Sequence, residues 1–329
     1  MKVQRVKGGR KMIEVYRTNE NTGVIEKEDK IVKGSWINLY NPSKEEIMKI
    51  IKETGVDKGF LEDSLDSEER SHIDIEDDQV LVSINVPAYD KSGKKIETKK
   101  YTTVPLGMVI VRDDYIITVS SEKLDILSGI TNKKPITGEF ATYKKSRIIF
   151  QVLYKVAESY ITYLDRINRD IENFEEKLGR TMKNQELVQL IYFQKSMIYF
   201  DAALKSNHTV MERLKRGKII KLYDEDEDIL EDATIENRQA LEMVSTYSEV
   251  LNGMIEVFST IVSNNLNIVM KFLTSITILL AVPTLISGLM GMNLEFPFST
   301  NVIGFWWVMI ACIATTILTW VLLKKRDMM

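Results

Sequence analysis

The sequence contains a single cysteine and two histidines in 329 residues. One cysteine cannot form an intramolecular disulfide, which fits a reducing compartment such as the cytoplasm. Neither His72 nor His208 has metal-ligand spacing around it, and no Gly-x-x-x-x-Gly-Lys phosphate loop is present. Cys312 lies in an apolar run, where a thiol is a poor nucleophile. We therefore expect neither an enzyme nor an organic cofactor.

Strong charge of one sign is also missing, because the formal net charge is only −3. This balance argues against a nucleic-acid partner, for which a concentrated basic face is expected. The first eleven residues are basic, but no apolar stretch follows them. A cleavable signal peptide is therefore not expected.

Charge is absent from two long stretches near the C-terminus, residues 272–290 and 302–323. Each is long enough for a helix that crosses the roughly 30 Å hydrocarbon core of a bilayer. We predict two transmembrane helices, joined by an outer loop at residues 291–301. Lys271 precedes the first stretch, a basic tail at residues 324–329 follows the second, and the loop has no Lys or Arg. The positive-inside rule then places both termini in the cytoplasm of a multi-pass protein of the cell membrane.

The first 142 residues have the pattern of an α/β cytoplasmic domain. A helix is predicted to start at Ser43, with Glu46 three residues later to complete a capping box. Short apolar runs bounded by turn residues predict strands. These strands are expected near residues 12–16, 34–39, 80–86, 102–111 and 115–119.

Apolar residues then recur at intervals of three and four, which predicts long helices. Residues 143–232 form an antiparallel helical arm in this interpretation, with a C-cap at Gly179 and a second helix from Asn184 to about Gly217. A third helix is predicted to start between Asp224 and Asp232. It continues through a cytoplasmic part, residues 233–271, to the end of the first membrane span, and its length of roughly 85 Å would couple the cytoplasmic domain to the membrane.

The first span carries small and polar residues at alternating spacings of three and four, which places them on one face of a helix. The members of this stripe are Asn267, Met270, Thr274, Thr277, Ala281, Thr284 and Gly288. Such a face either lets two helices pack closely or lines a pore shared by several copies. Two spans cannot enclose a channel alone, so a pore requires a ring of subunits. Met270 and Leu273 would then form apolar constrictions that close by dewetting, or would serve as ordinary packing residues.

Pro283 interrupts the backbone hydrogen bonds of this span. It is interpreted either as packing geometry or as a gating bend.

The three residues Gly291, Met292 and Asn293 end the first span. Together with the phrase at residues 263–271, with Pro283 and Thr284, and with the two-span C-terminus, they resemble the signature of the CorA family of divalent-cation channels. The resemblance implies an α+β membrane protein, in which an N-terminal α/β cytoplasmic domain and a long helical arm continue into two C-terminal transmembrane helices of a homopentameric funnel. It also implies gradient-driven Mg²⁺ uptake that is gated by cytoplasmic Mg²⁺.

The motif has a chemical rationale as a selectivity site. A ring of Asn293 amide oxygens hydrogen-bonds a hydrated cation without stripping its water, and Gly291 lets the backbone approach. Glu295 in the outer loop would raise the local cation concentration. The alternative is that Gly291 and Asn293 only cap the helix, because both residues suit a left-handed C-terminal position.

The resemblance further places a regulatory metal site at Asp90 and Asp232, between neighbouring subunits. Two carboxylates across an interface repel each other unless a divalent cation lies between them, so high internal Mg²⁺ would hold subunits together. Alternatively, Asp90 only starts a turn and Asp232 only favours a helix N-terminus. The acidic run at residues 224–228 is expected to be a solvated turn or to concentrate cations.

Two other functions stay open at this point. The transported ion could be Co²⁺, Ni²⁺ or Zn²⁺, since the fold also resembles zinc transporters whose motif varies. A membrane-tethered sensor or scaffold is the alternative from a different class, and it predicts no ion flux.

Overall fold

The computed structural model describes residues 12–19, 23–89, 101–132, 141–178, 184–217, 219–222, 224–292 and 302–326. The chain divides into two compact units, Met1–Asn252 (the first unit) and Gly253–Met329 (the second unit). The division falls inside one long helix, α6 (Asp224–Met290).

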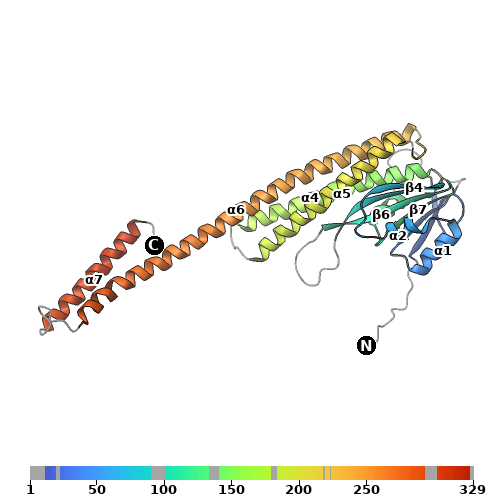
Figure 1. Cartoon of the computed structure of the whole chain (residues 1–329). Helices are drawn as coiled ribbons and strands as arrows, with labels where there is room; N and C mark the ends of the chain where they lie inside the picture. Colours follow the sequence, from blue (N-terminus) through green and yellow to red (C-terminus); the bar gives the residue numbers. More distant parts are fainter. Residues whose placement is uncertain are drawn as a thin grey trace, which may run out of the picture. The chain divides into compact units, whose positions relative to one another are not determined.

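A seven-stranded sheet with the order β2-β1-β3-β7-β6-β5-β4 forms the centre of the first unit (Figure 1). The strands are β1 (Ile13–Thr18), β2 (Ile25–Glu28), β3 (Trp36–Tyr40), β4 (His72–Glu76), β5 (Gln79–Tyr89), β6 (Tyr101–Val111) and β7 (Tyr115–Ser120). Neighbouring strands are antiparallel except β3 and β7, which pair in parallel through residues far apart in the sequence, such as Ile37 and Ile117.

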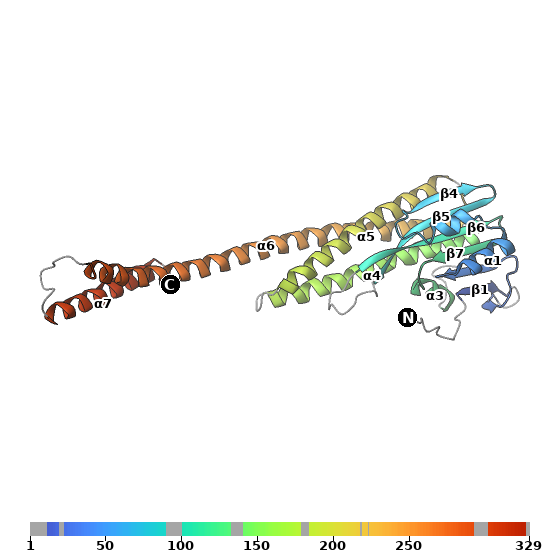
Figure 2. The same cartoon turned by 60° about the horizontal axis from the view of Figure 1, so that its bottom comes forward.

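Helices cover both faces of this sheet (Figures 1 and 2). On one face lie α1 (Lys44–Thr54) and α2 (Lys58–Asp63), and on the other lie α4 (Lys145–Leu178) and α5 (Asn184–Gly217). A short helix, α3 (Asp125–Asn132), precedes α4. The core under α1 and α2 is made of aliphatic and aromatic side chains, namely Ile37, Leu39, Ile50, Val56, Phe60, Leu61, Leu81, Val109, Val111, Ile117 and Val119.

The start of α1 shows how local sequence sets these elements. The Ser43 side chain accepts a hydrogen bond from the Glu46 backbone, and the Glu46 carboxylate accepts one from the Ser43 backbone. This reciprocal arrangement satisfies two donors that a helix N-terminus leaves open. The predicted capping box is therefore confirmed.

The docking of α5 onto the sheet depends on a buried asparagine. Strand β4 pairs with β5 only as far as Ser83, which leaves the backbone of Asn85 without a strand partner on that side. The Asn207 side chain of α5 accepts from the Asn85 backbone N–H at 2.9 Å and donates to its carbonyl at 2.8 Å. The amide thus replaces a neighbouring strand, because a buried backbone group without a partner is costly.

The first turn of α6 is held by a buried ion pair. The Arg147 guanidinium of α4 donates to the Asp226 carboxylate at 2.8 Å and to the Glu225 carboxylate at 2.6 Å. The Ser146 hydroxyl also donates to the Asp226 carboxylate, at 3.1 Å. Asp226 is fully buried. The acidic run is therefore the start of a helix and contains a structural residue, so the prediction of a solvated turn is wrong for Asp226. We call these four residues the α6 clamp.

The long helices agree with the predictions, whereas several short elements were not expected. Helix α5 has the predicted bounds, and α6 starts inside the predicted window. The sequence patterns did not predict β2, β4, α2 or α3. The proposed C-cap at Gly179 lies outside the described residues.

The clamp yields a stability prediction. The substitution Asp226→Asn keeps the side-chain shape but removes the charge beside buried Arg147. We expect the free energy of unfolding of the first unit to fall by about 3 kcal/mol. This value is at the lower end of the range for a broken buried ion pair, because Glu225 remains bound to Arg147. Urea denaturation of the full-length protein in detergent, followed by far-UV circular dichroism, measures the loss.

The matched control is Asp201→Asn, which breaks an exposed pair with Lys205 on α5. An exposed pair of this kind contributes about 0.5 kcal/mol or less. Equal, small losses for the two variants would contradict the structural role of the clamp.

Candidate functional site: the exposed face of the membrane helix

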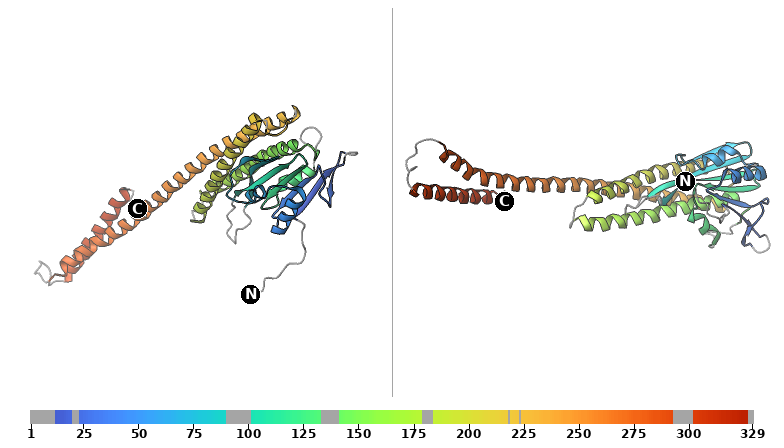
Figure 3. Two further views of the ribbon diagram at one scale, coloured as in Figure 1. Left: turned by 45° about the vertical axis from the view of Figure 1, so that its right-hand side comes forward. Right: turned by 90° about the horizontal axis from the view of Figure 1, so that it is seen from below.

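The second unit consists of the C-terminal part of α6 and of α7 (Val302–Lys325), which runs back beside it (Figure 3). Both helices contain windows that are long and apolar enough to cross a membrane. Within the described part of the chain, these windows are almost entirely unburied, and large apolar side chains such as Phe272 and Leu285 are more than half exposed. Apolar surface of this extent must be covered by lipid or by other copies.

One face of α6 is turned toward α7. Ser275 is completely buried, and Leu279, Val282 and Ile286 are half-buried. These residues follow one another at spacings of four, three and four, which is one face of a helix. This face is therefore occupied within a single chain.

The predicted stripe lies on the other side of the same helix. All of its members are exposed, as is Leu273 beside them. Thr277 lies two residues after Ser275, and Ala281 lies two residues after Leu279. Two residues correspond to a rotation of about 200° around the helix axis. The stripe therefore points away from α7 and stays open in one subunit.

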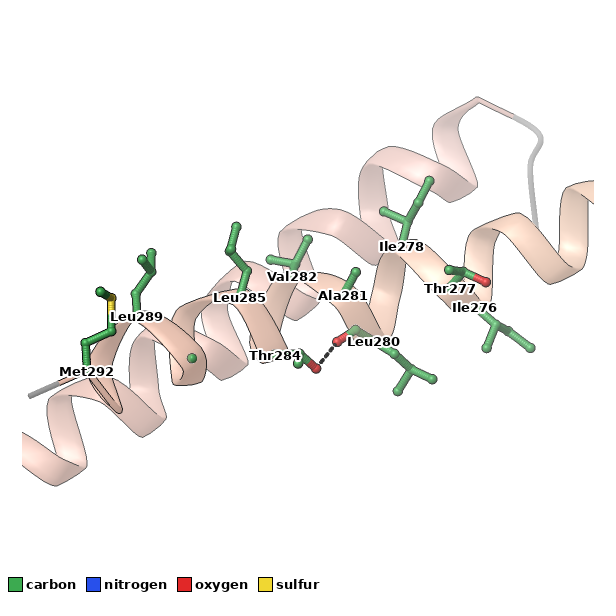
Figure 4. Close-up of a pocket in the computed structure, with 11 residues that line it drawn as sticks. Ile276, Thr277, Ile278, Leu280, Ala281, Val282, Thr284, Leu285, Leu289 and Met292 are labelled. Atoms are coloured by element: carbon green, nitrogen blue, oxygen red, sulfur yellow. Dashed lines mark hydrogen bonds between the residues drawn. The ribbon is translucent and has the colours of Figure 1, made fainter.

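A shallow groove overlaps the stripe at Thr277, Ala281, Thr284 and Gly288 and extends around the helix as far as Val282 on the α7 side (Figure 4). Its lining residues are Ile276, Thr277, Ile278, Leu280, Ala281, Val282, Thr284, Leu285, Gly288, Leu289 and Met292. The small residues Ala281 and Gly288 hollow the surface, and larger apolar side chains flank them. Ile278, Leu285 and Leu289 were not included in the predicted stripe, although a helical wheel places them next to it.

The threonine hydroxyls of the groove have a defined orientation. The Thr277 hydroxyl donates to the Leu273 carbonyl at 2.8 Å. The Thr284 hydroxyl donates to the Leu280 carbonyl at 2.7 Å (Figure 4). With the proton used inside the helix, the lone pairs of each oxygen remain available as acceptors. Water bound to a cation presents its hydrogens outward, so these oxygens suit a hydrated cation.

The motif residues follow the last turn of α6. The Gly291 N–H donates to the Ser287 carbonyl at 2.9 Å, and the Met292 N–H donates to the Leu289 carbonyl at 3.3 Å. The left-handed glycines among the described residues are Gly23, Gly34 and Gly55, so the left-handed cap proposed for Gly291 is wrong. A Cβ at position 291 would lie 3.3 Å from the Ser287 carbonyl oxygen, which is tight. Asn293 and Glu295 lie outside the described residues.

The two acids of the implied regulatory site are not brought together by one chain. Asp232 is exposed on α6, eight residues after the start of the helix. Asp90 lies outside the described residues, directly after Tyr89 at the end of β5. In the described ranges, no three acidic, histidine or cysteine side chains of a single chain gather to hold a metal ion.

The sequence of this chain is similar to that of known proteins along most of its length. The family described as CorA-like Mg²⁺ transporter protein matches residues 33–325. The Cobalt/magnesium transport protein CorA of Methanocaldococcus jannaschii is 27% identical over 302 residues, which cover 89% of this chain and 90% of that protein. The protein of the same name from Thermotoga maritima is 21% identical over 267 residues, covering 80% and 74%.

The solved complete structure of the CorA magnesium transporter from Methanocaldococcus jannaschii has the same fold. It superposes with a TM-score of 0.82 at 25% identity, and the match covers 98% of this chain and all of the other. Since the family match extends over most of the chain, it includes both the α/β unit and the two membrane helices. This chain belongs to the CorA-like Mg²⁺ transporter family.

Proposed function

We propose that this chain forms a homopentameric channel through which Mg²⁺ enters the cell down its electrochemical gradient. The observation that carries the proposal is the exposed polar stripe of α6, most of which lies in the uncharged part of the helix, residues 272–290. The Ser275 face of the same part is turned toward α7. Within lipid, such a face must meet protein or water. A ring of five copies gives each stripe a water-filled lumen, and family membership supports this assembly.

The stripe supplies successive rings along the pore in this proposal. Asn267 forms a polar ring at the cytoplasmic end, and Met270 and Leu273 form apolar constrictions that close by dewetting. Thr274, Thr277 and Thr284 form polar rings in which hydroxyl oxygens accept hydrogen bonds from hydration water. Ala281 and Gly288 keep the lumen wide between them.

The motif Gly291-Met292-Asn293 is the selectivity site at the outer mouth. Mg²⁺ gives up its water reluctantly and prefers octahedral oxygen surroundings. A ring of neutral Asn293 amides recognises the hydrated ion and releases it more readily than carboxylates would. Glu295, in the outer loop, attracts cations toward this mouth.

The membrane potential is sufficient to drive uptake. A doubly charged ion gains about 4.6 kcal/mol when it enters a compartment at −100 mV. Uptake of this kind requires neither ATP nor a catalytic residue. The gain is in the inward direction because the interior is negative.

Regulation is proposed to act through Asp90 and Asp232 of neighbouring subunits. Mg²⁺ between the two carboxylates screens their repulsion and holds the closed ring together. Asp232 lies on α6, the same helix that carries the stripe, so a change at the acids acts directly on the pore helix. High internal Mg²⁺ therefore reduces its own entry.

Co²⁺ is a second candidate substrate, because the two curated relatives are named cobalt/magnesium transport proteins. It has the same charge as Mg²⁺ and a similar hydrated form. Competition between the two ions in one flux assay ranks them.

The selectivity proposal is tested with Asn293→Ala. In proteoliposomes with an inside-negative potential and low internal Mg²⁺, we expect Mg²⁺ influx to fall by roughly tenfold or more, equivalent to about 1.4 kcal/mol. The control is Asn168→Ala, which removes an exposed amide on α4 that donates to Glu172. Unchanged influx in the Asn293 variant would reject the motif as the selectivity site.

The orientation of the threonines gives a second test. Thr284→Val keeps the side-chain shape but removes the acceptor oxygen, so we expect slower Mg²⁺ influx, by roughly three- to tenfold for one lost hydrogen bond per subunit. The control is Thr315→Val on α7, which removes an equivalent bond to the Ala311 carbonyl. A pore lined by Thr284 predicts loss only in the first variant, and equal influx in both would oppose it.

The regulatory proposal is tested with Asp232→Asn. Removing one carboxylate weakens the proposed cation site, so the internal Mg²⁺ concentration that halves influx should rise by roughly tenfold. Asp228→Asn, one turn earlier on α6 and also exposed, is the matched control. An identical inhibition curve for wild type and the Asp232 variant would exclude this residue from the site.

A further inference from the structure

Aromatic residues lie near both ends of α7, but basic residues lie at only one. Phe305, Trp306 and Trp307 are each more than 60% exposed near the first end. Near the other end lie Trp320 and, beyond it, Lys324 and Lys325. Aromatic rings at both ends of a span mark the two membrane interfaces. The two interfaces therefore differ in charge.

At the basic end, an ammonium group and an indole form one unit. The Lys324 Nζ lies 5.2 Å from the centre of the Trp320 ring, which is cation–π distance. Trp320 is 45% exposed. In the described part of the chain, its indole N–H donates to no acceptor. The pair thus presents both a positive charge and a free donor at the same place.

The hairpin adds a further cation to this end. Residue Lys271 precedes the apolar part of α6, and Lys324, Lys325 and Arg326 follow the apolar part of α7. Because α7 runs back beside α6 (Figure 3), the residues that precede the apolar part of α6 and those that follow the apolar part of α7 lie at the same end of the hairpin. Ser275, four residues after Lys271, and Leu323, directly before Lys324, are both buried, which agrees with that arrangement.

The charge at this end is not neutralised within the described chain. None of the four basic side chains has a carboxylate within ion-pair distance among the described residues. In the sequence, Asp327 is the single nearby acid, so four basic residues less one acid leave a charge of +3. Each subunit therefore presents cationic groups where the headgroups of a bilayer begin.

We propose that this basic end, made of Lys271, Trp320, Lys324, Lys325 and Arg326, binds the headgroups of anionic phospholipids. The Lys and Arg groups donate charge-assisted hydrogen bonds to phosphate oxygens. The Trp320 ring lies at the headgroup level, and its N–H provides a further donor. The opposite end, with aromatic rings and no basic residue, binds its interface without preference for charge. The inference depends on the membrane hairpin and not on which ion is conducted.

The test measures which lipid lies beside Trp320 in the full-length protein. Trp306 and Trp307 are replaced by Phe, which leaves Trp320 as the tryptophan at membrane level. Trp36 is completely buried in the first unit and contributes a constant, unquenched signal. The protein is reconstituted in vesicles of phosphatidylcholine and phosphatidylglycerol, in which one or the other lipid is brominated at the same mole fraction.

We expect brominated phosphatidylglycerol to quench Trp320 fluorescence more strongly than brominated phosphatidylcholine does. The difference should correspond to an enrichment of phosphatidylglycerol beside Trp320 of about threefold to fivefold. Added salt should reduce this difference in quenching. The quadruple substitution Lys271→Gln, Lys324→Gln, Lys325→Gln, Arg326→Gln removes all four cations and should make the two lipids quench equally. The variant Lys324→Arg, Lys325→Arg keeps the charge and should keep the preference.

The reciprocal protein, with Trp320→Phe and with Trp306 and Trp307 retained, reports the opposite end and should show no preference. Equal quenching by the two lipids beside Trp320 would overturn the inference. A preference that survives the quadruple substitution would overturn it as well. Because no flux is measured, failure here is separate from failure of the channel proposal.

Discussion

A divalent cation cannot leave water for hydrocarbon, and this constraint governs the design of the membrane helices. Two spans must be apolar where they meet lipid and must offer oxygen where an ion passes. The structure meets both demands on α6 by dividing its surface. The Ser275 face packs within the chain, and the stripe that includes Thr277 and Thr284 stays open. A subunit with one open polar face is incomplete alone, which is the physical argument for a ring.

The same helix connects the chemistry of the membrane to the α/β unit. Its first turn is held by Arg147 through Asp226, and its exposed Asp232 lies less than two turns further on. Buried ion pairs specify a geometry more than they add stability, because desolvation offsets most of the attraction. The clamp therefore sets where α6 begins and which face it presents. The regulatory role that we propose for Asp232 depends on this fixed position.

Local sequence predicted those parts whose energetics are local. The capping box of Ser43 and Glu46, the bounds of α5 and the apolar spans all depend on neighbours within a few residues. The missed strands β2 and β4 are short and charged, with residues such as Glu28 and Asp74 on exposed edge strands. Their pairing is stabilised by partners that no short window contains. The burial of Asp226 was missed for the same reason, since Arg147 lies 79 residues away.

The sequence by itself determined that this chain has two membrane helices and a stripe of small and polar residues on the first. Both conclusions follow from the absence of charge and from the helical period, which a linear pattern expresses completely. Only the tertiary structure decided which face of α6 meets α7, how β3 pairs in parallel with β7, and that Asn207 completes the edge of β5. These depend on contacts between distant segments, where packing and the need to pair buried polar groups select one partner among many.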